Sequence, residues 1–86
     1  MTKKQRGTLE AIFADPVRAN VAWHDVESLL LALGAELSEG RGSRLRVALN
    51  GVRHVFHRPH PANEAGKPTV RDLRRFLTEA GIERPE

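Results

Sequence analysis

The segment from Gly40 to Pro61, GRGSRLRVALNGVRHVFHRPHP, concentrates the side chains that could do chemistry in this chain. It contains five arginines, three of the four histidines and no carboxylate. Without these five charges the formal net charge of +3 would be negative, so the chain is basic because of this one segment. Arginine binds phosphate through paired hydrogen bonds, and histidine exchanges protons near neutral pH. The segment therefore predicts a local anion-binding site that also holds acid–base groups.

The composition of the whole chain limits what surrounds this segment. Its 86 residues suffice for one small domain with a single core of two layers. The absence of cysteine excludes disulfides, thiolate zinc sites and a cysteine nucleophile, and nothing in the sequence calls for a cofactor. No apolar run approaches the roughly 20 residues of a membrane span, and the N-terminal MTKKQRG lacks the apolar stretch of a signal peptide. We therefore expect a cytoplasmic protein without a membrane partner, whose basic charge attracts RNA, DNA or an acidic protein.

Within the basic segment, two alternating stretches flank Asn50-Gly51, the residue pair preferred in type I′ turns. The stretches Arg44 to Leu49 and Val52 to Arg58 each alternate polar and apolar residues, which predicts a β-hairpin. Counting back from a two-residue turn gives four cross-strand pairs: Leu49 with Val52, Val47 with His54, Leu45 with Phe56 and Arg44 with His57.

This register separates the hairpin into two faces. The inner face, expected to lie against helices, carries Leu45, Val47, Leu49, Val52, His54 and Phe56. The outer hairpin face, expected to be exposed, carries Arg44, Arg46, Ala48, Arg53, Val55 and His57. We expect this outer face to form an all-basic surface without interleaved acids, with Arg44 and His57 as neighbours.

Two elements before the hairpin are predicted from apolar periodicity. A short helix from Lys3 to Ala14 has one narrow apolar stripe and is expected to dock on the core. A second helix begins at Trp23, and Gly34 is its expected C-terminal cap. An edge strand from Ala35 to Glu39 then leads into the glycine-rich turn before the hairpin.

The last element follows the turn-rich segment from Pro59 to Pro68. Thr69 is the expected N-cap of a final helix with Asp72 three residues on, and Gly81 is expected to end it. Arg74 and Arg75 are expected on its solvent side. The predicted fold is therefore α+β: a short N-terminal helix, then α-β-β-β-α with a three-stranded antiparallel sheet and both main helices on one face.

Several segments in this order resemble the HicA-type toxins of bacterial type II toxin–antitoxin systems. They are WHDV leading into LLLALG, then GRGSR, then a strand into RPHP, and finally KPTVRDLRRFLTEAGI, from about Ala22 to Ile82. The resemblance implies a fold like the double-stranded RNA-binding domain, mRNA interferase (endoribonuclease) activity and neutralisation by a HicB-type antitoxin. It also divides the chain into an N-terminal helix and connector, residues 1–21, and a HicA-like domain, residues 22–86.

The chain departs from the family at one position. HicA toxins usually carry their catalytic histidine directly after Gly-Ser in the glycine-rich turn, but here Arg44 follows Gly42-Ser43. Since the predicted register places His57 beside Arg44, we hypothesise that the neighbouring strand supplies the imidazole. His60 lies in Pro59-His60-Pro61, which resembles the family's proline-flanked histidine segment after the last strand.

Metal-independent RNA cleavage needs a base for the 2′-OH, an acid for the leaving oxygen and cations for the phosphate. The catalytic candidates are His57, Arg44 and His60. The candidate RNA contacts are Arg41, Ser43, Arg46, Arg53, Arg58, Lys67 and Arg71. No metal site is expected, because His54 and His57 point to opposite faces of a strand.

Two alternatives to an enzyme remain open at this point. The first is a module of the same fold that binds RNA without cleaving it, since the family's histidine position is occupied by Arg44. The second is a protein whose basic face binds only an acidic protein partner. A steep salt dependence of RNA binding without cleavage distinguishes the first from the second.

Overall fold

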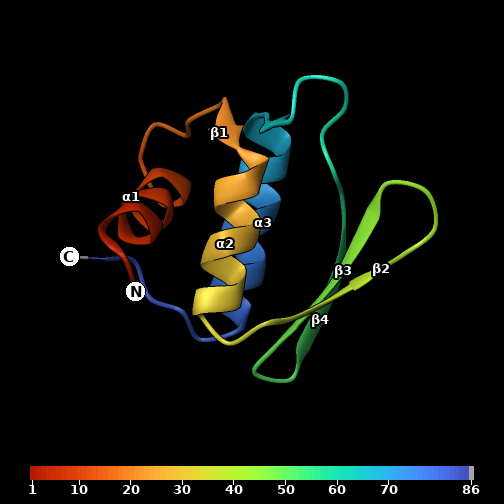
Figure 1. The fold of residues 1–86 in the computed structure, drawn as a ribbon. Coiled ribbons are helices and arrows are strands. Elements are labelled where there is room, and N and C mark those ends of the chain that lie inside the picture. The colour runs from red at the N-terminus through yellow and green to blue at the C-terminus, as the bar shows by residue number, and fades with distance from the viewer. Residues whose placement is uncertain (86) are drawn as a thin grey trace.

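A computed structural model describes residues 1–85 of the chain (Figure 1). Its central sheet has three antiparallel strands in the order β2 (Glu36–Glu39), β3 (Arg44–Leu49) and β4 (Val52–His57). The two main helices, α2 (Trp23–Ala32) and α3 (Lys67–Glu79), lie on the same side of this sheet. The predicted α+β fold, with its α-β-β-β-α order like that of the double-stranded RNA-binding domain, is confirmed.

The hairpin has the predicted register, and all four predicted pairs are present, including Arg44 with His57. Asn50 and Gly51 both have positive φ, at 51° and 83°, as a type I′ turn requires. The side-chain amide of Asn50 also donates to the carbonyl of Ala80 at 2.8 Å, which ties the hairpin turn to the end of α3. The turn therefore sets both the register of the strands and their position along the helix.

The core lies between the inner face of the hairpin and the two main helices. Leu45, Val47 and Phe56 are at most 2% exposed, as the predicted burial of this face requires. The helices contribute the other buried side chains of this layer: Trp23, Val26, Leu29 and Leu30 from α2, and Val70, Leu73, Phe76 and Leu77 from α3. A positive φ at Gly34 and at Gly81 lets the chain turn after each helix, as predicted.

The start of α3 differs from the prediction. The helix begins at Lys67 with Gly66 as its N-cap and has no side-chain cap, so the predicted Thr69 and Asp72 capping pair is wrong. Pro68 favours this earlier start, because its fixed φ suits the first helical turn and the N–H that it lacks has no partner there. Thr69 consequently lies inside the first turn, and Asp72 is free to contact β4.

A second, smaller sheet was not predicted. Within the turn-rich segment, β5 (Glu64–Ala65) pairs antiparallel with β1 (Val21–Ala22), directly before α2. Two-residue strands have too few positions to show alternation in the sequence. The small sheet joins the two segments that lead into α2 and α3, so both helices start at the same end of the molecule (Figure 1).

The N-terminal helix, α1 (Lys3–Ile12), docks on the core as expected. Leu9, Ile12 and Phe13 are buried, with Ile12 fully inaccessible. Arg74 of α3 donates to the carbonyls of Ile12 at 3.0 Å and Ala14 at 2.6 Å, so its predicted solvent-facing position is wrong. Carbonyls at a helix C-terminus lack intrahelical partners and carry partial negative charge, which explains why a guanidinium is bound there.

None of the helices described within residues 1–85 has the length and apolar character needed to span a membrane.

Candidate functional site

Arg44 and His57 are directly opposite each other on adjacent strands, and both side chains are exposed. They lie on the outer hairpin face because Leu45 and Phe56, their neighbours in sequence, point into the core. Together they line a shallow hollow whose other lining residues are Gly40, Arg41, Arg46 and Val55. The hollow therefore contains three guanidinium groups and one imidazole.

The glycine turn, Gly40–Ser43, brings Arg41 to the edge of this hollow. The Gly40 amide donates to the carbonyl of Arg44 at 2.9 Å, and the Arg44 amide donates to that of Arg41 at 3.2 Å. A Cβ at position 40 would lie 3.0 Å from the Cβ of Arg44, which is tighter than nine in ten real Cβ contacts. Glycine at position 40 therefore lets the chain fold back tightly over Arg44 without displacing it.

The rest of the outer hairpin face continues the basic surface, but an acid interrupts it. Arg46 pairs with Val55, and Ala48 pairs with Arg53, with both arginines exposed. On β2, Glu36 pairs with Ala48 and so joins the same face. The expectation of an all-basic outer sheet face is therefore wrong, because the edge strand β2 adds Glu36 to this face beside the hairpin.

His57 also borders a second hollow on its other side. This hollow is lined by residues at the end of β4 and at the start of α3, namely Val55, Phe56, His57, Pro68, Thr69, Asp72 and Arg75. His57 thus lies between the basic hollow around Arg44 and the first turns of α3. A chain laid across both hollows would pass directly over the imidazole.

The remaining candidates lie outside the basic hollow. Ser43 and His60 are exposed, the first in the glycine turn and the second in the loop after β4. Lys67 is the first residue of α3, and Arg71 lies one turn further on, both exposed. The tertiary structure therefore places Arg41, Arg44, Arg46 and His57 together, and the other four candidates are not part of that group.

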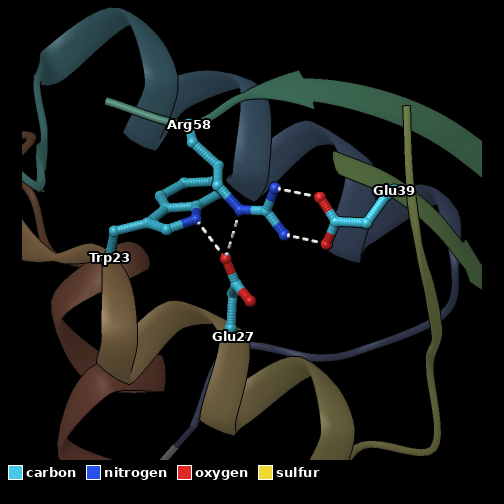
Figure 2. Close-up of polar contacts among 4 residues, drawn as sticks. All are labelled: Trp23, Glu27, Glu39 and Arg58. Carbon is cyan, nitrogen blue, oxygen red and sulfur yellow. Dashed lines mark hydrogen bonds and ion pairs between the residues drawn. The ribbon is translucent and has the colours of Figure 1, made fainter. Parts of the chain in front are cut away.

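Arg58 has a different environment from the other arginines (Figure 2). Its two terminal nitrogens donate to the carboxylate of Glu39 at 2.6 and 2.7 Å, and its Nε donates to Glu27 at 3.0 Å. The same Glu27 oxygen accepts a 2.6 Å hydrogen bond from the indole of Trp23. We call these four residues the Arg58 clamp. Its hydrogen bonds lower the pKa of Glu39 and raise that of Arg58.

Sequence reasoning missed a second polar pair beside the site. The imidazole Nε2 of His54 lies 2.7 Å from the carboxylate of Asp72, and its ring contacts Phe56 edge-on with centroids 4.6 Å apart. The alternation of the strand predicts His54 on the inner face. It does not identify Asp72 as the partner of His54, because that contact depends on how α3 packs across the sheet. Among residues 1–85 no group of three metal-ligating side chains comes together.

The order of these elements agrees with the comparison to known families. A family model described as the HicA toxin of bacterial toxin–antitoxin matches residues 23–82, which run from the start of α2 to just beyond α3. Neither the curated proteins nor the solved structures yield a match. The match spans most of the chain and includes the sheet, the glycine turn and both main helices, so the chain belongs to the HicA toxin family of bacterial toxin–antitoxin systems.

Proposed function

We propose that this toxin is a metal-independent endoribonuclease that cleaves mRNA on the outer hairpin face. Membership of the HicA family supports RNA cleavage as its activity. The observation that carries the proposal for this chain is the exposed pair of Arg44 and His57 in a basic hollow. It supplies an imidazole beside the position where the family's histidine is replaced by arginine.

In this mechanism His57 takes the proton from a ribose 2′-OH, and the freed oxygen attacks the adjacent phosphorus. Negative charge grows on the phosphate oxygens as the bond to the 5′ oxygen breaks, and Arg44 lies where it can bind that charge. The leaving 5′ oxygen takes a proton from His60 or from water. Arg46 and Arg53 hold neighbouring phosphates, with Arg41, Ser43, Lys67 and Arg71 as further contacts around the hollow.

A toxin of this family has an antitoxin partner, and we propose that the partner is of the HicB type. An antitoxin that covers the outer hairpin face with carboxylates would block RNA and neutralise the exposed arginines at once. Exposed Val55, at 46%, offers the one large apolar contact on the hairpin within the part of the chain that the structure describes.

Cleavage of single-stranded RNA by the purified protein in EDTA tests the enzyme. We expect defined fragments in vitro and growth arrest in cells that express the protein alone, relieved by co-expressed antitoxin. Intact RNA together with unchanged growth would exclude catalysis.

The second candidate is an RNA-binding module that does not cleave, favoured by the arginine at position 44. It predicts RNA binding that weakens steeply with salt while the RNA stays intact. RNA binding no stronger than that of a basic protein of equal charge would instead favour an acidic protein as the only partner of this face.

A further inference from the structure

We infer that Arg58 is a positioning residue, which holds the glycine turn and the end of β4 so that Arg44 and His57 stay opposite each other. The inference rests on the proposed function in treating these two residues as the reactive pair. It assigns Arg58 a role different from that of the exposed arginines, which we propose bind RNA phosphates.

The first observation is that Arg58 is bound to both ends of the glycine turn. Its guanidinium forms a two-pronged ion pair with Glu39, the last residue of β2 before the turn. Its backbone amide donates to the carbonyl of Ser43, the last residue of the turn, at 2.9 Å. Arg58 therefore binds the chain both before and at the end of the glycine turn. Arg44 directly follows Ser43, and His57 directly precedes Arg58, so these contacts act next to the reactive pair.

The second observation is that the clamp is attached to the rigid part of the fold. Glu27 and Trp23 lie one turn apart on α2, and the indole is 5% exposed and packs near Phe56 of β4 with ring centroids 6.3 Å apart. Because one Glu27 oxygen accepts from both Trp23 and Arg58, the guanidinium is held relative to the helix as well as to the turn (Figure 2). A guanidinium bound to carboxylates of two different elements is fixed in position and is less able to move toward a phosphate.

The third observation concerns charge. Arg58 contacts two carboxylates, Glu27 and Glu39, so the three groups together carry a formal charge of −1. Its side chain is 26% exposed, compared with 72% for that of Glu39. A cluster with net negative charge repels phosphate, whereas Arg44 and Arg46 are exposed in the basic hollow.

The alternative is that Arg58 is a phosphate-binding residue. In that case Glu39 only occupies its guanidinium in the free protein and is displaced when RNA binds. The two readings predict opposite effects of Glu39→Gln, and Glu36→Gln is the matched control because it removes the same charge from the same exposed strand. Hydrogen exchange of the Gly40, Arg44 and Arg58 amides reports on the turn directly. We expect exchange about tenfold faster in Glu39→Gln and unchanged in Glu36→Gln. Equal exchange in the two variants would overturn the positioning role.

Kinetics provide the second readout. For Glu39→Gln we expect kcat to fall about tenfold or more, from misplacement of the reactive pair, with KM and the salt dependence of RNA binding as in Glu36→Gln. Tighter RNA binding than in Glu36→Gln, with a salt slope steeper by about one phosphate contact, would show that Arg58 had been released to bind RNA and would refute the inference.

Arg58→Lys completes the design, because lysine keeps the charge but lacks the planar fork that reaches both carboxylates. We expect the same faster exchange and lower kcat as in Glu39→Gln, whereas a simple phosphate contact would tolerate lysine. If the wild-type protein does not cleave RNA, the proposed function fails, and the exchange measurements still decide whether Arg58 holds the turn.

Discussion

His54 and His57 lie three residues apart on β4 and have opposite surroundings. His54 faces α3, where its ring lies close to Asp72, and it also contacts Phe56 of its own strand, while His57 faces outward next to Arg44. Among the described residues no side-chain hydrogen bond involves His57. The contrast shows that the environment of each imidazole follows from strand alternation and from what covers each face, so one histidine supports the fold and the other is available to a ligand.

The largest expected effect is on RNA cleavage, and it separates these two histidines. His57→Ala should lower kcat by about a hundredfold or more, because general acid–base catalysis contributes at least that much. His54→Ala should keep most of the cleavage activity when measured below its unfolding temperature. His24→Ala is the matched control, since His24 is exposed on α2 away from the hairpin. Cleavage retained in His57→Ala would contradict the site assignment.

A smaller loss is expected at the partner of His57. Arg44→Ala should lower kcat by about tenfold to a hundredfold, since it removes a cation from the phosphate while leaving the base in place. Single-turnover rates measured at saturating RNA isolate this effect from binding. A change confined to KM would assign Arg44 to RNA binding alone.

For stability, the larger effect is expected on the His54 side of β4 and the smaller one at His57. Asp72→Asn should lower the free energy of unfolding by about 1 kcal/mol, because it weakens a partly buried hydrogen bond to His54. His57→Ala, at an exposed site without described hydrogen bonds, should change it by less than about 0.5 kcal/mol. Urea unfolding followed by Trp23 fluorescence measures both. Equal losses in the two variants would remove the distinction between the two faces of β4.

Arg53, an exposed arginine outside the basic hollow, should affect only RNA binding and its salt dependence. Arg53→Gln should reduce the slope of log affinity against log salt by about one phosphate contact. Arg18→Gln removes an equally exposed charge from the connector after α1 and should leave that slope unchanged. Fluorescence anisotropy of labelled RNA over a salt series provides the measurement, and identical slopes in the two variants would place Arg53 outside the RNA path.

The smallest effect concerns pH and the Arg58 clamp. The hydrogen bond from Arg58 lowers the pKa of Glu39 below its ordinary value of 4.5. The link is therefore complete above that value, and its contribution to holding the turn is lost as the pH falls through the lowered pKa. Carboxyl chemical shifts of Glu39 and Glu36 during an acid titration test this. In Arg58→Gln the Glu39 pKa should return toward its ordinary value, and an unchanged pKa would mean that the ion pair does not form in solution.

Local patterns were sufficient to predict the hairpin and its faces. Asn50-Gly51 accepts the positive φ values of a type I′ turn, and a two-residue turn leaves one register for the alternating strands. The pairing of Arg44 with His57 follows from that register alone. The apolar stripes of α1 and α2 were equally informative, because helix periodicity and burial agree in both.

The roles of the other polar residues depended on packing between distant segments. Arg58 belongs to the same basic segment as Arg53, yet its partners come from α2 and β2. Arg74 reaches the carbonyls of α1, about sixty positions earlier, and Glu36 joins the basic face only because β2 pairs with β3. Charge and residue type are read along the chain, whereas the partner that neutralises a charge is set by which elements lie side by side. The sequence alone was therefore sufficient to predict where the basic surface lies, and the tertiary structure distinguished its exposed arginines from the one held by two carboxylates.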